Sequence, residues 1–291
     1  MLGGPGTELA RPWILTCDDD RPRGATGRVG HARDRLRGAR AQARSTTPRV
    51  VGRRAYDGAV NAATYPGCHI YWARLDELHP RHLPLLDDLE LGRRKAYRRE
   101  EDRARFTLAA VMLRLVVAAH SGVAPACAVV DRTCADCGKP HGRPRLPSGG
   151  LDLSVTHSGD FAAVATSTAG PVGIDLEAVR PFDHEALVNE VLALEERDEA
   201  TSVKAFFTYW TRKESVLKAT GAGLSIPMRA LTVTPPAQPP RLLCYPSVPA
   251  LQARMIDISP ARDYPGAATV LSDEPVAFHP QDGSALLRAY R

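Results

Sequence analysis

Apolar positions recur at helical spacing in two long stretches of the chain. In residues 83–120 they include Phe106 and Leu113, and in residues 183–220 they include Trp210. A separation of three, four or seven positions places side chains on one face of a helix. We therefore predict one or two helices in the first stretch and a helical region in the second.

Shorter stretches alternate apolar and polar positions with the period of a β-strand. They are "HIYWARL", the two halves of "LDLSVTHSGDFAAVATS" on either side of a turn at Ser158-Gly159-Asp160, "VGIDLE", and the late segments "ALTVTP", "RLLCYP", "QARMIDIS", "ATVLS" and "PVAFHP". These strands mix with the helices without regular β-α-β alternation. That mixture predicts an α+β fold.

Residues 1–66 show neither pattern. They are rich in glycine, proline, alanine and arginine, a composition that buries too little apolar surface to offset the entropy of ordering, so we expect a disordered extension. Residues 21–54 alone hold eleven arginines and one aspartate, whereas the whole chain has a net charge of +5. An arginine arm can bind nucleic acid, but this one has no interleaved aromatic residues, which disfavours that role.

Composition narrows the setting of the chain. A hydrophobic content of 44% supports a buried core, and six cysteines are too few for a dense disulfide framework. This cysteine usage favours a reducing compartment such as the cytoplasm. We find no apolar run of about 18 residues, the length that predicts a membrane span, and no apolar stretch after a basic start that would predict a signal peptide.

Two carboxylates interrupt the strand "VGIDLE". Asp175 and Glu177 are two residues apart, so they share one face of the strand, while Val172, Ile174 and Leu176 share the other. This pattern has two interpretations. One is an amphipathic strand with a solvated outer face. The other is a site for a hard cation such as Mg²⁺, which takes carboxylate and phosphate oxygens as ligands.

The stretch "FFTYWTRKESVLKATGAGLSIP" adds a third carboxylate and two lysines. Glu214 and Lys218 are four residues apart and are neighbours on one helix face, which a surface ion pair would also explain. Lys213 lies at the edge of the apolar stripe, a poor place for a lysine unless an anionic group meets it. Together with Asp175 and Glu177, this set suits Mg²⁺ and a phosphorylated substrate.

Two further segments carry candidate chemistry. The basic run from Arg93 to Arg105 is either a solvated helix face or an anion-binding edge. In the loop "RTCADCGKPHGRPRL", Cys134, Cys137 and His141 have the spacing of a partial metal knuckle. A structural zinc site usually has four protein ligands, and no second C-x-x-C is present to complete one. The loop therefore favours reduced thiols over a zinc site.

The segments "VGIDLE" and "WTRKESVLKATGAGL" resemble the paired signature of the Sfp-type 4′-phosphopantetheinyl transferases, and "HGRPRL" and "SVTHSG" lie where that family has its G-K/R-P and S-H-S elements. The resemblance covers roughly residues 70–235. It implies two similar α+β subdomains with a pseudo-twofold relation, residues 67–170 and 171–291, and an active site between them.

The resemblance also implies an activity of the holo-[acyl-carrier-protein] synthase type. The 4′-phosphopantetheine arm of coenzyme A would pass to a serine of an apo acyl or peptidyl carrier protein, with release of 3′,5′-ADP. We expect a monomer that acts in the cytoplasm and needs Mg²⁺. Carrier proteins of fatty-acid, polyketide and nonribosomal-peptide pathways all fit, so secondary metabolite biosynthesis is among the expected roles.

Each candidate residue gains an implied role from this resemblance. Asp175, Glu177 and Glu214 would hold Mg²⁺ on the pyrophosphate. Glu196 would help to deprotonate the carrier serine, and Lys218 would protonate the leaving group. The contacts to coenzyme A would come from Arg93, Arg105, Arg143, Thr156, His157, Asp175, Lys213 and Lys218.

Two other classes of function fit part of the sequence. An arginine-tailed nucleic-acid-binding protein would use residues 21–54 and would leave the carboxylates and lysines without a role. A Mg²⁺-dependent phosphohydrolase would share the metal site, but it would need no carrier protein.

Overall fold

The structure is a computed structural model that describes residues 67–134, 137–180, 185–246 and 248–290. The expected disorder of residues 1–66 lies outside the described residues.

A four-stranded sheet forms from both ends of the described chain, in the order β2-β3-β1-β9. Strand β3 (Phe161–Ser167) pairs antiparallel with both β1 (Gly67–Arg74) and β2 (Asp152–Ser158). Strand β9 (Ala277–Asp282) comes from the far end of the sequence and pairs parallel with β1. Residues 277–290 therefore lie with the first sheet, although the boundary expected from the sequence places them in the second subdomain.

The first predicted helical stretch forms two helices, α1 (Asp88–Ala96) and α2 (Glu100–Ser121). Helix α2 is buried without a break from Phe106 to Ala118, because it packs on the first sheet and is flanked by α1 and by α5 (Ser284–Ala289). It is the one helix in the described residues whose length and composition would allow it to cross a membrane, yet 72% of that apolar window is buried inside the protein.

A second, antiparallel sheet has the order β4-β8-β7. Its strands are β4 (Val172–Leu176), β7 (Ala253–Ile258) and β8 (Gly266–Leu271). A separate two-stranded ribbon pairs β5 (Thr232–Val233) with β6 (Leu242–Cys244). Each strand predicted from the alternation of apolar and polar positions is present, and the mixture of sheets and helices is an α+β architecture.

The second predicted helical stretch forms α3 (Glu185–Val191), a 3₁₀ turn (Leu194–Glu199) and α4 (Val203–Thr220). Ser202 caps α4 at its start by accepting a hydrogen bond from the backbone of the first turn. The helix ends at Gly221, whose φ of 72° is left-handed and favours glycine.

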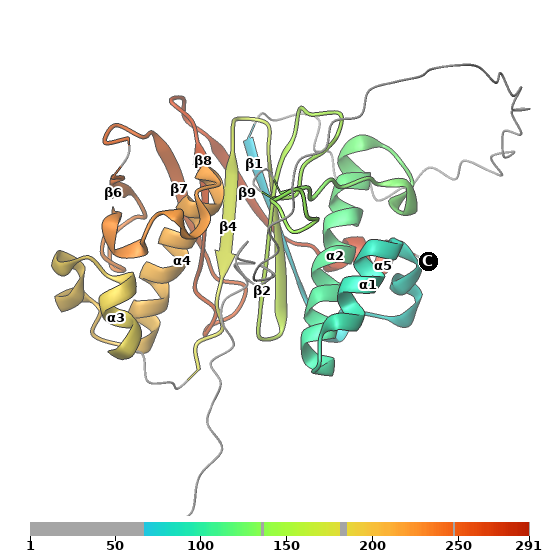
Figure 1. The fold of residues 1–291 in the computed structure, drawn as a ribbon, viewed down its shortest axis with the longest axis horizontal. Coiled ribbons are helices and arrows are strands. Elements are labelled where there is room, and N and C mark those ends of the chain that lie inside the picture. Colours follow the sequence, from blue (N-terminus) through green and yellow to red (C-terminus); the bar gives the residue numbers. More distant parts are fainter. Residues whose placement is uncertain (1–66, 135–136, 181–184, 247, 291) are drawn as a thin grey trace, which may run out of the picture. The chain divides into compact units, whose positions relative to one another are not determined.

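These elements stack in four layers, with α2, the first sheet, the second sheet and α4 in that order (Figure 1). Small and branched apolar side chains, among them Ile70, Ala163, Ile174 and Val270, fill the space between the two sheets. Helix α4 approaches β4 closely because of Gly173, where a Cβ atom would lie 2.0 Å from the carbonyl oxygen of Ser215. This close approach holds the charged face of α4 against the strand that carries Asp175 and ends next to Glu177.

Strands β2 and β4 lie side by side where the two sheets meet. The Oγ of Ser154 accepts a hydrogen bond of 3.1 Å from the backbone N of Ile174, and the Oγ of Ser158 accepts one of 3.1 Å from Ala178. Serine hydroxyls thus take the place of backbone ladder bonds along this seam. The seam brings Thr156 of β2 next to Asp175 of β4.

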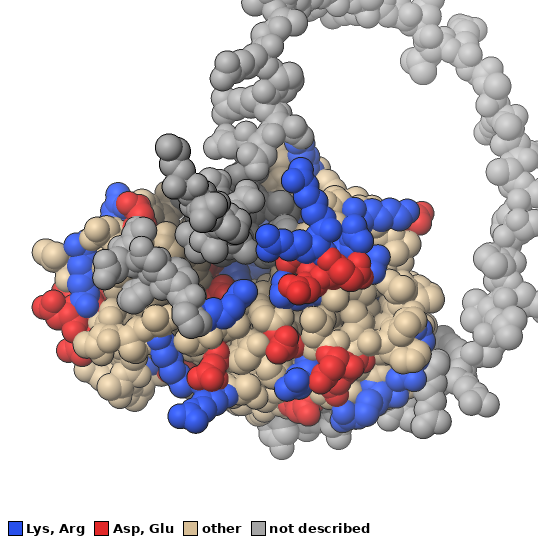
Figure 2. All heavy atoms as spheres, turned by 90° about the horizontal axis from the view of Figure 1, so that it is seen from below, with Lys and Arg blue, Asp and Glu red and all other residues tan. Residues whose placement is uncertain are grey.

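One face of the molecule carries Lys and Arg side chains interspersed with Asp and Glu (Figure 2). A nucleic-acid interface more often shows a stripe or patch of positive charge. The arginine-rich residues 21–54, on which the nucleic-acid interpretation rests, lie outside the described residues.

Candidate active site

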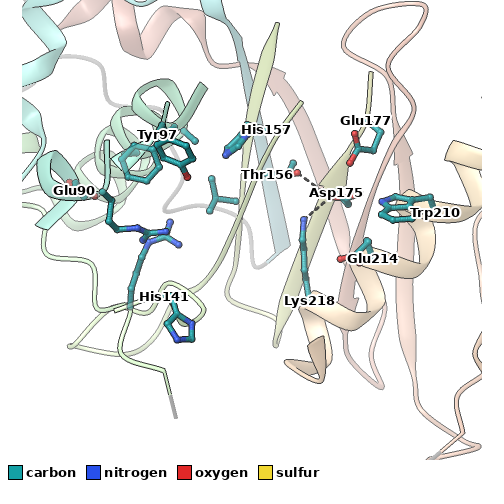
Figure 3. A pocket seen from close by; sticks show the side chains of 16 residues that line it. Glu90, Tyr97, His141, Thr156, His157, Asp175, Glu177, Trp210, Glu214 and Lys218 are labelled. Carbon is teal, nitrogen blue, oxygen red and sulfur yellow. Dashed lines mark hydrogen bonds and ion pairs between the residues drawn. The ribbon is translucent and has the colours of Figure 1, made fainter. Parts of the chain in front are cut away.

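A pocket with about 990 Å³ of free space, part of it open solvent, lies where α1, α2, β2, β4 and α4 come together (Figure 3). Charged and polar side chains face it from both sides, with a few apolar ones between them. The lining residues are Glu90, Arg93, Tyr97, Phe106, Ala109, Ala110, Arg132, His141, Val155, Thr156, His157, Asp175, Glu177, Trp210, Glu214 and Lys218.

The three predicted metal ligands all line this pocket. Asp175 lies on β4, Glu177 follows the end of that strand, and Glu214 points to them from α4 (Figure 3). Asp175 and Glu214 are each only 4% exposed, and every residue of β4 is buried. The interpretation of "VGIDLE" as a strand with a solvated outer face therefore does not hold.

Two carboxylate oxygens in this group, Oδ2 of Asp175 and Oε1 of Glu214, are buried and have no hydrogen-bond partner among the described residues. A buried polar atom without a partner is unfavourable, so such atoms call for a ligand, an ion or water. The carboxylates are spread more widely than the ligands of a closed cage, since they are not within 4.8 Å of one another as a set. Mg²⁺ keeps several waters and needs only one or two carboxylates, so these residues fit it.

Burial raises the pKa of Glu177 to about 8 and the pKa of Glu214 to about 7, and the charge of Asp175 contributes to both. The Oγ of Ser158 donates a 2.7 Å hydrogen bond to Oε2 of Glu177, which opposes part of the rise. Acids with such raised pKa values in one cleft are typical of functional sites. A cation among them would restore the charged form of both groups.

We expect the affinity for Mg²⁺ to rise by at least ~10-fold between about pH 6 and about pH 8, because binding must displace the protons held by Glu177 and Glu214. Isothermal titration calorimetry with MgCl₂ at the two pH values would measure this, and two buffers of different ionisation enthalpy would count the protons released. Mg²⁺ affinity independent of pH would contradict the assignment.

The same raised pKa values affect stability. Without Mg²⁺ the folded protein keeps protons that the unfolded chain has lost. The free energy of unfolding should therefore fall as the pH rises from the ordinary pKa of glutamate through these raised values.

Lys218 is the cation at the centre of the cluster. Its Nζ donates a hydrogen bond of 2.6 Å to Oδ1 of Asp175 and one of 3.0 Å to the carbonyl oxygen of Ile174. The Oγ1 of Thr156 donates to the same Oδ1 at 3.1 Å. Burial alone would lower the pKa of Lys218. The charges of the three pocket carboxylates, Asp175, Glu214 and Glu177, raise this pKa above its ordinary value, so the ammonium group stays charged.

Two of the predicted coenzyme A contacts face the carboxylates across the pocket. His157 lies on β2 between Tyr97 and Asp175 (Figure 3). Burial lowers the pKa of His157 to about 4, with a contribution from the charges of Lys218 and Arg105, so its imidazole is neutral near neutral pH.

Arg93 lines the same wall, on the side away from the carboxylates. Its guanidinium lies 5.2 Å from the ring centre of Phe106 and donates a 3.3 Å hydrogen bond to the carbonyl oxygen of Pro140. Of the basic run from Arg93 to Arg105, Arg93 therefore faces the pocket.

Arg105 and Arg143 do not line the pocket. Arg105 donates to the carbonyl oxygen of Gly159 at 2.8 Å, next to the turn between β2 and β3. Arg143 donates to the carbonyl oxygens of Val172 at 3.0 Å and Ala219 at 3.1 Å, so it joins β4 to the end of α4. Both arginines hold the walls of the site in this structure.

Lys213 and Glu196 form a buried ion pair away from the pocket. Lys213 is fully buried and donates to Oε2 of Glu196 and to the carbonyl oxygen of Val191, the latter at 2.8 Å. Glu196 is 3% exposed, and its Oε1 accepts from the backbone N of Val233 at 2.9 Å. Lys213 does meet an anionic group, as its position predicts, but that group is Glu196. Neither side chain lines the pocket in this structure, so the geometry does not bring the predicted coenzyme A contact of Lys213 or the predicted base Glu196 together with the carboxylates.

Sequence reasoning missed several residues of the pocket. The helical spacing places Trp210 only in the apolar stripe, yet it also faces the carboxylates (Figure 3). Arg132 enters from the loop before β2, and burial lowers its pKa to about 10. No periodic pattern marks Arg132 or Tyr97, because both lie outside regular elements and are placed by tertiary packing.

Comparisons with known proteins find similarity to one superfamily. Residues 171–269 match the model of the 4′-phosphopantetheinyl transferase superfamily. The chain is 32% identical over 192 residues to the 4′-phosphopantetheinyl transferase HetI of Nostoc sp., an alignment that covers 59% of this chain and 80% of that protein. It is 38% identical over 88 residues to the 4′-phosphopantetheinyl transferase AcpT of Salmonella typhimurium, covering 28% of this chain and 46% of AcpT.

A third relative is the 4′-phosphopantetheinyl transferase gsp of Aneurinibacillus migulanus, which is 33% identical over 91 residues, or 28% of this chain and 37% of that protein. The residues that the family model matches include β4, α4 and the cluster of Asp175, Glu177, Glu214 and Lys218. The extent of the HetI alignment and the match to the family model together show that this chain belongs to the 4′-phosphopantetheinyl transferase superfamily.

Proposed function

We propose that this transferase is of the Sfp type and moves the 4′-phosphopantetheine arm of coenzyme A to a serine of an apo carrier protein, releasing 3′,5′-ADP. The observation that carries the proposal is the pair of buried, unpartnered oxygens on Asp175 and Glu214, in one pocket with Lys218. The reaction cleaves a pyrophosphate, and such a cluster suits the handling of pyrophosphate charge.

The metal would be held by Asp175, Glu177 and Glu214. Mg²⁺, when bound, neutralises charge on the phosphate oxygens and orients the pyrophosphate. Lys218 supplies a fixed positive charge at the same place. Its raised pKa makes it a better stabiliser of phosphate oxygens than a donor of a proton to the leaving nucleotide.

The nucleotide end of coenzyme A would lie on the opposite wall. Arg93 and Arg132 are the cations of that wall, and a guanidinium can make paired hydrogen bonds to phosphate. His157 is neutral, so it would donate a hydrogen bond and would not contribute a charge. Tyr97 and Phe106 provide apolar surface beside these groups.

The serine hydroxyl needs a base, because it is a weak nucleophile while protonated. Glu196 is buried in its pair with Lys213. Glu177 is the most exposed of the three pocket carboxylates and is therefore the one that an incoming serine hydroxyl can approach most directly. With Mg²⁺ beside it Glu177 would be ionised, so it could accept a hydrogen bond from that hydroxyl and orient it.

Measurement of released 3′,5′-ADP separates this function from a phosphohydrolase. The enzyme would be incubated with coenzyme A and Mg²⁺, alone, with apo carrier proteins of fatty-acid, polyketide and nonribosomal-peptide pathways, and with the same carriers bearing alanine at the modified serine. Chromatography should show 3′,5′-ADP only when the serine is present. Release without any carrier would show a hydrolase, and no release from any carrier would contradict the proposal.

A further inference from the structure

The thiols of the C-x-x-C loop have no role in the proposed transfer reaction, and residues 131–134 pair with residues 137–145 as a hairpin. Asp131 and Arg145 bridge its base, and the backbone N of Gly142 donates to the carbonyl oxygen of Arg132 at 2.6 Å. The backbone N of Cys134 donates a hydrogen bond of 2.8 Å across the hairpin to the carbonyl oxygen of Lys139. These bonds turn the chain so that residues four apart project to one side.

Two glycines make this turn possible. Gly138, directly after the second cysteine, has a φ of 70°, and its N donates to the carbonyl oxygen of Cys134 at 2.9 Å. At Gly142 a Cβ atom would lie 2.7 Å from the carbonyl oxygen of Thr133. Left-handed backbone and close chain approach both favour glycine. These two glycines therefore allow the chain to turn back on itself.

The turn gathers three metal-ligating side chains. One ligand atom each of Cys134, Cys137 and His141 lies within 4.8 Å of the others, the one such group of three in the described residues. The Sγ of Cys137 is 2.9 Å from Nε2 of His141. In a tetrahedral zinc site with bonds of about 2.3 Å to sulfur and about 2.0 Å to nitrogen, neighbouring ligand atoms lie about 3.5–3.8 Å apart. Small side-chain rotations would bring the three atoms to those distances.

We propose that Cys134, Cys137 and His141 hold a Zn²⁺ ion, with water as the fourth ligand. Thiolate and imidazole together favour zinc over the hard cation of the carboxylate site. Cys137 is exposed and Cys134 and His141 are partly exposed, so water can reach the fourth position. From the sequence alone, a site with only three protein ligands favours reduced thiols over zinc. In the structure, the imidazole of His141 already lies beside the two thiols.

The ion would fix the wall of the pocket at this point. His141 is both a ligand and a lining residue, and Arg132 lies on the opposite side of the hairpin with its side chain in the same pocket. Arg93 also contacts this loop, through the carbonyl oxygen of Pro140. Zinc would therefore act as a positioning element, while its binding does not depend on the proposed transfer reaction.

Metal analysis of the full chain tests the zinc site without any activity measurement. Protein purified without chelators, then assayed by inductively coupled plasma mass spectrometry, should carry about one zinc per chain. Cys134→Ser and Cys137→Ser should each reduce the zinc content at least ~10-fold. Matched controls are Cys127→Ser and Cys244→Ser, which remove exposed thiols outside the hairpin and should leave the zinc in place. His141→Cys should retain the metal with a third thiolate.

Two further measurements guard against variants that fail to fold. Cobalt exchanged into the unaltered protein should show thiolate-to-metal charge transfer and the strong visible bands of tetrahedral Co²⁺. A chromogenic zinc chelator should report about one zinc released per chain when the thiols are blocked. Zinc far below one per chain, zinc kept by the Cys134→Ser and Cys137→Ser variants, or a disulfide between these cysteines in protein purified under reducing conditions would each overturn the proposal.

Discussion

Asp175→Ala should lower turnover at saturating carrier protein by about 10²–10³, the loss found when one well-placed electrostatic contact to a developing charge is removed. Asp175 accepts hydrogen bonds from both Lys218 and Thr156, and its second oxygen is buried without a partner. Its removal takes one carboxylate from the proposed metal site and releases Lys218 from its position. Steady-state assays with coenzyme A and an apo carrier protein would measure the loss, and circular dichroism should be unchanged.

Other variants of the cluster sharpen this test. Glu214→Ala should lose turnover to a similar extent, because its Oε1 is the second buried oxygen without a partner. Glu177→Ala should have a smaller effect on metal affinity, since water can replace one carboxylate of Mg²⁺, and excess Mg²⁺ should partly rescue weak binding. Asp273→Ala removes an exposed carboxylate and serves as the control. Near-normal transfer by Asp175→Ala would rule out the metal-site assignment.

Glu196→Ala should reduce the free energy of unfolding by about 3–5 kcal/mol, because it leaves the buried ammonium of Lys213 without its partner. Urea unfolding monitored by tryptophan fluorescence would measure this loss. Turnover per folded molecule should stay near that of the unaltered protein, because the pair does not line the pocket.

The paired replacement Lys213→Met with Glu196→Leu removes both charges and should recover most of the stability, since buried ion pairs are often replaceable by apolar residues of similar volume. If Glu196 were the catalytic base, the opposite results would be expected. Glu196→Ala would lose turnover with little change in stability, and the double variant with Lys213→Met and Glu196→Leu would be inactive although well folded.

The local spacing of apolar and polar residues was sufficient to predict the helices, the strands and part of the site. Asp175 and Glu177 share a face because the strand period is two, and Glu214 and Lys218 share one because four residues make about one helical turn. Both strand and helix are present, and the three carboxylates and Lys218 meet in one pocket.

Those patterns could not predict contacts between segments that are distant in the sequence. The parallel pairing of β9 with β1 joins residues about 210 positions apart, and no periodicity encodes it. Lys213 carries the signal of a buried lysine, but that signal does not distinguish a phosphate from Glu196. The position of Arg132 depends on how the hairpin of residues 131–145 folds against α1.

Intact-mass spectrometry of an apo carrier protein is the most direct test of the proposed transfer. The carrier would be incubated with this enzyme, coenzyme A and Mg²⁺, in parallel with samples that contain a chelator, Asp175→Ala enzyme, or a carrier with alanine at the modified serine. We expect the carrier to gain the mass of one phosphopantetheine group in the complete reaction and to stay unmodified in the other three. A carrier panel that remains unmodified with folded, Mg²⁺-supplied enzyme, or modification that persists equally with Asp175→Ala, would contradict the function assigned to this pocket.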